Sequence, residues 1–211
     1  MSRWSEGQER TLLAGWLLAL WSPITYGWAA YVGQSTLMMA DLLRRSTELV
    51  ALFLAWAVYR WARKNDVAMS VYTRWETTAN LLVAAVMGLS VVVIGIQAYQ
   101  RFLQPGTLGD LRWGIVLGVL GVMVNGWFWR RHKRYAGESH WPMAESQYRL
   151  FRSKALLDAY VVVNLSTAAY VQRQSWGLYV DSLGALVPGA VLAVSAIQIL
   201  RIHWQKGGHN P

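Results

Sequence analysis

The stretch MMADLLRRSTELVALFLAW, residues 38–56, lies in one of the most apolar regions of the chain and still carries four charges: Asp41, Arg44, Arg45 and Glu48. A segment of about 20 mostly apolar residues is long enough to cross a bilayer as a helix. Charges within such a segment are costly in hydrocarbon, and they normally face a bundle interior or a water-filled cavity. The role of these four side chains is therefore the main question that the sequence raises.

The composition is typical of a protein whose surroundings are a lipid bilayer. Charged residues make up 15% of the 211 residues and hydrophobic residues 55%, whereas roughly a quarter of residues are charged in soluble domains. Thirteen Trp and ten Tyr stand against four Phe, and amphipathic rings of this kind gather at membrane–water interfaces. The sequence contains no Cys, which excludes disulfides and thiolate metal sites.

Six segments are long and apolar enough to be candidate membrane spans. They are residues 12–32, 35–58, 78–99, 113–129, 154–171 and 176–200. The first is not expected to be a signal peptide, because acidic and basic residues are mixed before it and no clear cleavage site follows. We expect an all-α integral membrane protein in which a bundle of six transmembrane helices forms a single transmembrane domain, residues 1–211.

Basic residues are distributed unequally between the two sides of these spans. Fourteen of the twenty Lys and Arg residues lie before the first span, in the 59–77 and 130–153 connections or after the last span, whereas three lie in the opposite loops. Because loops rich in Lys and Arg remain cytoplasmic, both termini are predicted to be cytoplasmic, and we expect the bacterial inner (plasma) membrane as the location. The net charge of +9 is clustered between apolar spans, which favours membrane topology over nucleic-acid binding.

Helical spacing explains how the four charges of the second span can coexist. Asp41 lies four residues before Arg45, and Arg44 lies four residues before Glu48, so each acid can meet a base one turn away. Pairing lowers the cost of burying charge without removing it. Two interpretations stay open: a self-neutralised cluster that holds the helix to its neighbours, or a pathway in which carboxylates exchange protons or bind cations.

The fifth and sixth spans supply further polar residues. Asp158, about a turn into the fifth span, and Asn164, near its middle, are candidate transport-site residues. Asp158 is placed equally well to form an ion pair with Lys154 at i,i+4. Asp181 opens the last span, where we expect its carboxylate to stay wet and to serve as a cap or structural residue.

Glycine and proline positions suggest how the spans pack. The runs GIVLGVLG (114–121) and SLGALVPGA (182–190) predict close helix-packing surfaces. Pro23 and Pro188 can kink their helices, because each lacks a backbone donor.

Motifs for catalysis are lacking. The sequence has neither a His–Glu–x–x–His motif nor a nucleophile elbow. All four histidines lie in expected loops or in the tail: His132, His140, His203 and His209. We expect no enzymatic activity, no cofactor and no bound metal.

Several segments together resemble the transmembrane domain of the cation diffusion facilitator (cation efflux) family, which exports divalent metals such as zinc. STLMMADLLRRSTELVAL (35–52) is similar to the family's second span, with its Ala-Asp-x-x-His-x-x-x-Asp helix. YTRWETTANLLVAAVMGLSVVVIGIQAYQRFLQP (72–105) is similar to its third span and YVDSLGALVPGAVLAVSAIQILR (179–201) to its sixth. The likeness covers nearly the whole chain, and the number and orientation of the spans agree.

The resemblance implies a degenerate metal site. In that family, motifs in the second and fifth spans supply four ligands to a tetrahedral metal. The corresponding positions here are Arg44, Glu48, Leu157 and Val161. Only Glu48 is a usable donor, since a guanidinium has no lone pair; a register shifted by one residue would add Asp158. We also expect no C-terminal cytoplasmic metal-binding domain.

Three functional hypotheses follow from the resemblance and the charged span. The first is a secondary transporter of the cation diffusion facilitator type with altered ion selectivity, including proton-coupled cation efflux by antiport. The second is a transport-inactive relative that acts as a membrane scaffold or partner subunit. The third is a transporter of an anionic or zwitterionic solute recognised by Arg44 and Arg45. The resemblance also implies a homodimer, with a small ion or solute as substrate.

Overall fold

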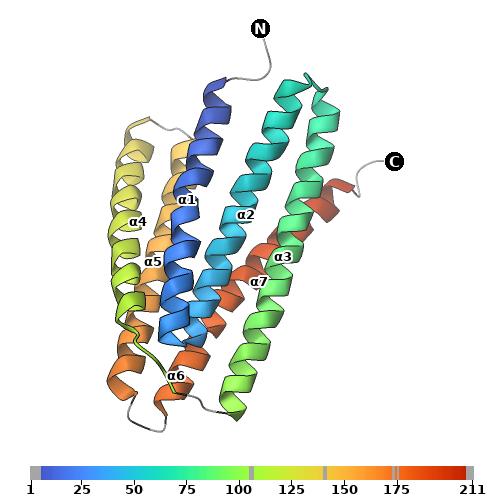
Figure 1. Ribbon diagram of the computed structural model, residues 1–211. Helices are drawn as coiled ribbons and strands as arrows, with labels where there is room; N and C mark the ends of the chain where they lie inside the picture. Colours follow the sequence, from blue (N-terminus) through green and yellow to red (C-terminus); the bar gives the residue numbers. More distant parts are fainter. Residues whose placement is uncertain (1–5, 105–106, 140–141, 173, 175, 208–211) are drawn as a thin grey trace. The chain divides into compact units, whose positions relative to one another are not determined.

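A computed structural model describes residues 6–104, 107–139, 142–172, 174 and 176–207. Over these residues the chain forms seven helices and no strand (Figure 1). They are α1 (Glu6–Gly33), α2 (Thr36–Lys64), α3 (Met69–Leu103), α4 (Arg112–Ser139), α5 (Pro142–Val171), α6 (Gly177–Gly184) and α7 (Leu186–Gly207). The predicted all-α fold is confirmed.

The helices belong to two compact units. The first contains Met1–Gly27, Met39–Gln97 and Leu186–Pro211, and therefore most of α1, α2 and α3 together with α7. The second contains Trp28–Met38 and Ala98–Ala185, and therefore α4, α5 and α6 with the adjoining ends of the first three helices. The charged residues of α2 all lie in the first unit, whereas Asp158, Asn164 and Asp181 lie in the second.

The helices extend well beyond the predicted spans. The expected 59–77 connection shrinks to residues 65–68, because α2 continues to Lys64 and α3 begins at Met69. Similarly, α4 and α5 extend into most of the expected 130–153 connection. Apolarity alone marks only the part of a helix that suits hydrocarbon. The flanking segments are rich in Arg, Lys, Glu, Gln and Ala, which are good helix formers in water.

The last predicted span is not one continuous helix, because α6 ends at Gly184 and α7 begins at Leu186. Pro188 lacks an N–H group, so the carbonyl of Gly184, four residues earlier, has no helical donor. The hydroxyl of Tyr160 on α5 donates to that carbonyl oxygen instead, at 3.1 Å. The helix is therefore interrupted three residues before Pro188 and not kinked at Pro188 itself. The other predicted kink position, Pro23, lies inside α1, which continues through it.

Among the residues that the structure describes, two segments are long and apolar enough to cross a membrane: Met69–Leu103, with mean hydropathy 2.4, and Tyr179–Arg201, with 2.1. Only 22% and 33% of their most apolar windows are buried, which differs from the core helix of a soluble protein. The charges of α2 prevent that helix from meeting the same standard. The count of six spans and the cytoplasmic termini remain predictions.

Aromatic side chains join α1 to α2 in the first unit. The rings of Trp16 and Trp56 stack with their centroids 5.9 Å apart, and Phe53 lies 5.3 Å from Trp16. Further along α2, Tyr59 and Ala62 form a buried cluster with Leu12, Val67 and Tyr72 packed against it.

Glycine contacts join α4 to α5 in the second unit, where the two helices lie side by side (Figure 1). A Cβ atom at Gly118 would lie 2.6 Å from Val162 Cγ2, and one at Gly114 would lie 2.9 Å from Leu165 Cδ1. A side chain at Gly118 would require Val162 to shift, and one at Gly114 would require Met38 and Leu165 to shift. The prediction that residues 114–121 form a close packing surface is confirmed.

Candidate functional site

The beginning of α2 is fixed by two acceptors for its free amides. The hydroxyl oxygen of Ser35 accepts a hydrogen bond from the N–H of Met38 at 3.1 Å, as an N-cap residue does. Asp181 of α6 accepts from the N–H of Thr36 at 2.7 Å and from the hydroxyl of Ser35. The first turn of a helix has unpaired N–H groups that need such partners, so these contacts anchor the helix that carries the charges.

The solvent exposure of Asp181 differs from the expectation. Its side chain is fully buried, so the prediction that it stays wet is wrong. The physical reason is that both carboxylate oxygens are taken up by the beginning of α2 rather than by water. Its predicted role as a cap is confirmed, although it caps another helix and not its own.

The four charges of α2 form one connected network. The two pairs predicted from spacing are present, with Arg44 Nη1 at 2.7 Å from Glu48 Oε1 and Arg45 Nε at 2.8 Å from Asp41 Oδ2. A third contact joins them, because Arg44 also donates to Asp41 Oδ1 from Nε and from Nη2, each at 2.8 Å. Asp41 is therefore the common acceptor for both arginines.

Arg45 has further partners on α1 that the spacing within α2 could not reveal. It donates to the hydroxyl of Tyr26 at 2.9 Å and to that of Ser22 at 3.2 Å. Its guanidinium carbon lies 3.9 Å from the centroid of the Tyr26 ring, within the range of cation–π attraction. Ser22 and Tyr26 lie four residues apart, so they occupy one face of α1, and that polar spacing in an apolar span is the signal that was missed.

Burial falls along the network from Asp41 to Glu48. The exposed fractions of the side chains are 0% for Asp41, 5% for Arg44, 13% for Arg45 and 34% for Glu48. A cation that approached Asp41 would have to displace two guanidinium groups from a carboxylate without water access. Glu48 is therefore the carboxylate of this network that can be reached from outside.

Asp158 belongs to a different polar centre, between α5 and α4. Its side chain is buried, and Oδ2 accepts a hydrogen bond from Asn125 Nδ2 at 2.7 Å. A Cβ atom at Gly121 would lie 2.6 Å from the same oxygen, so the absence of a side chain there makes room for the carboxylate. The ion pair with Lys154 remains a prediction. Asn125 was missed, although a lone Asn in an apolar span was a usable signal.

Asn164 is not brought together with Asp158. Its amide packs against Gly184 of α6, so closely that a Cβ atom at Gly184 would overlap it. Its Oδ1 is buried and has no hydrogen-bond partner among the residues that the structure describes. The two α5 candidates therefore face different neighbours, α4 for Asp158 and α6 for Asn164.

Of the four positions that correspond to the family's metal ligands, only Glu48 has a usable donor, and it is paired with Arg44. Arg44 and Glu48 are bonded to each other, Leu157 is half-buried and Val161 is buried. Within the described part of the chain, no group of three or more His, Cys, Asp or Glu residues could hold a metal ion. The side chains of His132, His140, His203 and His209 lie outside that part.

Long apolar helices with ionised side chains inside one of them are typical of integral membrane transport proteins. The sequence profile described as "Cation efflux transmembrane domain" matches residues 12–204. The match covers most of the chain, so the chain belongs to the cation efflux family, and the resemblance is confirmed. The chain is thus a membrane protein and, at the level of its family, a cation transporter rather than an enzyme. No curated protein is similar enough to be matched.

Proposed function

We propose that the chain is a secondary transporter whose site accepts a proton or a weakly held monovalent cation rather than zinc. The observation that carries this proposal is the position of Arg44, which occupies a place where the family has a metal ligand and bridges Asp41 and Glu48. Its guanidinium cannot coordinate a metal at any accessible pH.

Electrostatics support this selectivity. The network contains two acids and two arginines and is formally neutral, so it gives a divalent cation no net attraction. Two unit charges 4 Å apart interact by about 4 kcal/mol at an effective dielectric constant of 20, and the energy doubles for a divalent ion. Repulsion by Arg44 and Arg45 thus offsets the attraction of Asp41 and Glu48.

Glu48 is the proposed exchanging group. It is one-third exposed, whereas its partner Arg44 keeps contacts with Asp41 through two further N–H groups. When Glu48 takes up a proton or binds a cation, the network carries one net positive charge, and Arg44 remains in contact with the Asp41 carboxylate. Asp158, buried between α5 and α4, is the second proposed proton- or cation-handling carboxylate.

One observation favours a second candidate function, a transport-inactive relative that acts as a scaffold or partner subunit. Asp41 and Arg44 are buried and bonded to each other, as expected of a cluster whose role is to hold helices together. Recognition of an anionic or zwitterionic solute would require Arg44 or Arg45 to exchange a carboxylate for that solute.

The proposal includes the number of membrane spans, the side on which the termini lie and the oligomeric state. Six spans in a single transmembrane domain, with both termini in the cytoplasm, are supported by the charge bias of the loops and by helices long enough to cross a bilayer. An α-helical bundle fits the bacterial inner membrane, and a homodimer is proposed from membership of the family.

The experiment that tests the proposal is ion flux in proteoliposomes that contain a pH-sensitive dye. An imposed gradient of Na⁺ or K⁺, or a proton gradient alone, is expected to give flux that Glu48→Gln abolishes. Glu76→Gln is the matched control, because Glu76 is exposed and lies outside the predicted span. Zinc flux that depends on Glu48 would refute the selectivity, and absence of flux with every ion would favour the scaffold.

A further inference from the structure

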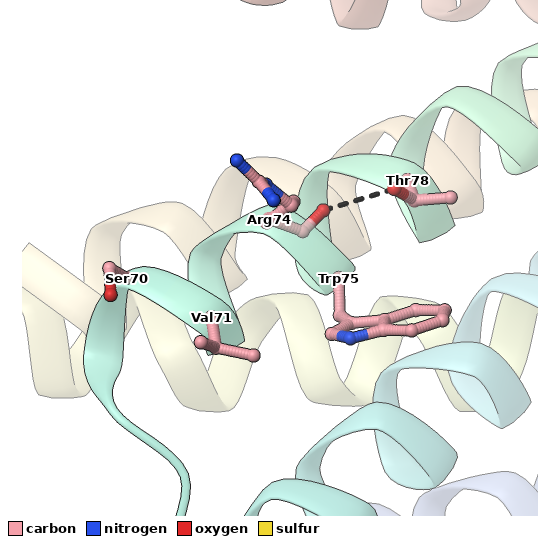
Figure 2. Close-up of a pocket in the computed structure, with 5 residues that line it drawn as sticks. All are labelled: Ser70, Val71, Arg74, Trp75 and Thr78. Carbon is pink, nitrogen blue, oxygen red and sulfur yellow. Dashed lines mark hydrogen bonds between the residues drawn. The ribbon is translucent and has the colours of Figure 1, made fainter.

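A hollow of about 650 Å³ lies along the first turns of α3, separate from the charged network. It is lined by Ser70, Val71, Arg74, Trp75 and Thr78 (Figure 2). At 100° per residue these five positions fall within an arc of about 140° on the helix. They therefore form one face of α3, here called the head face.

The head face has a positive charge that is not paired with any acidic side chain in the described ranges. Arg74 is exposed, and its guanidinium makes no hydrogen bond or ion pair with any residue that the structure describes. Arg63, by contrast, lies 3.2 Å from Glu9. The first turn of α3 has no acidic residue, and Glu76 lies about 170° from the centre of the head face.

The remaining side chains of the head face are apolar or carry hydroxyl groups. Trp75 is half-exposed, and its ring meets that of Trp61 edge-on at 5.5 Å, which holds it in place. Thr78 donates to the carbonyl oxygen of Arg74 at 3.1 Å, shown as the dashed line in Figure 2, and Ser70 is an exposed residue. A cation, a hydroxyl donor and an amphipathic aromatic ring suit the interface between lipid headgroups and acyl chains.

An exposed apolar stripe continues the head face along α3. It consists of Leu82, Leu89, Val92 and Ile96, all of which are exposed. At 100° per residue these four positions fall within the same arc of about 140°. One face of a single helix thus offers a basic hollow followed by an apolar surface, in the order in which a phospholipid presents its phosphate and its acyl chains.

We propose that this face binds an anionic phospholipid, with the phosphate at Arg74 and Ser70 and the acyl chains along the stripe. A free phosphate ion would gain nothing from the stripe or from Trp75. A second copy of the chain, packed on this face about a two-fold axis, would place the same surface on both sides of the contact. The unbalanced charges of the two Arg74 side chains would then oppose each other.

The test counts bound lipids by native mass spectrometry of the full chain, titrated with phosphatidylglycerol or phosphatidylcholine. Arg74→Gln is expected to weaken the first phosphatidylglycerol site about fivefold, the effect of one basic residue near a membrane surface, and to change phosphatidylcholine binding little. Arg152→Gln is the matched control, since Arg152 is also an exposed arginine, on α5, and less than about a twofold change is expected. Trp75→Leu should weaken both lipids.

Three results would overturn the proposal. The first is an equal effect of Arg74→Gln and Arg152→Gln, which would show only general attraction of anionic lipid to a basic protein. The second is displacement of phosphatidylglycerol by millimolar inorganic phosphate, which would assign the hollow to a soluble anion. The third is a loss of dimer in Arg74→Gln or Trp75→Leu without loss of lipid. Thermal unfolding of both arginine variants checks that they are folded, and none of these readouts depends on transport.

Discussion

Asp41→Asn is the substitution that most directly tests the description of the charged network. Asn has nearly the same volume, but it removes the charge shared by Arg44 and Arg45 and turns one acceptor oxygen into a donor. Removal of one partner from a buried ion pair costs about 3–5 kcal/mol, because the other charge stays buried. Asp41 has no solvent exposure and accepts hydrogen bonds from both arginines. We therefore expect Asp41→Asn to lower the free energy of unfolding by about 3–5 kcal/mol.

Glu48→Gln is the internal reference for that measurement. Glu48 is one-third exposed, and Arg44 keeps its ion pair with Asp41 when Glu48 loses its charge. Glu48→Gln is therefore expected to lower the free energy of unfolding by about 1 kcal/mol or less, as for exposed pairs. The free energy of unfolding of both variants would be measured by reversible titration with SDS in mixed micelles. We expect Asp41→Asn to be less stable than Glu48→Gln by about 2–4 kcal/mol.

A double variant distinguishes the effect of the unpaired arginine charge from the effect of the changed side-chain shape in Asp41→Asn. Asp41→Asn combined with Arg45→Met restores neutrality and should recover part of the stability lost in Asp41→Asn alone, because an apolar side chain replaces an unpaired charge. Asp41 is not the shared partner of the two arginines if Asp41→Asn costs no more than Glu48→Gln, or if the double variant is less stable than the sum of its single substitutions predicts.

Further predictions concern helix ends, packing and topology. Asp181→Asn should destabilise the protein by about 1–2 kcal/mol, as loss of an N-cap does, because it removes an acceptor from Ser35 or Thr36; unchanged unfolding in SDS would contradict the capping role. Gly121→Ala should cost about 1–3 kcal/mol by overpacking, whereas Gly126→Ala, with nothing within 4 Å of its Cβ position, should be neutral or stabilising; equal effects would contradict the close approach of α4 and α5. A C-terminal tag should react with an impermeant reagent only from the cytoplasmic side, and labelling from the outer side would overturn the topology.

Interactions within one helix could be predicted from the sequence. The Arg44–Glu48 and Asp41–Arg45 pairs depend only on a spacing of four residues, and any helix over this stretch brings them together. Similarly, the glycines of residues 114–121 share one side of a helix whatever the rest of the fold. The i,i+3 contact of Arg44 with Asp41 was equally local and could have been predicted with the pairs.

Interactions between helices could not be predicted in the same way. Asn125 and Asp158 are 33 residues apart, and no spacing rule indicates that their helices are adjacent or in which register. The burial of Asp181 depends on the beginning of α2 lying beside it, which the sequence near Asp181 does not reveal. The break before Pro188 was located only approximately, because the freed carbonyl of Gly184 is stabilised by Tyr160 from another helix.

The shared acceptor role of Asp41 has a consequence for how this family member can change in evolution. Because one carboxylate serves two guanidinium groups, loss of Asp41 takes an acceptor from both arginines at once, whereas loss of Glu48 takes one from Arg44, which keeps its contact with Asp41. Substitutions that start at Glu48 should therefore cost less stability than those that start at Asp41. Relatives that retain arginine at both positions 44 and 45 should retain aspartate at position 41 even where position 48 varies, so the three positions should covary as a unit.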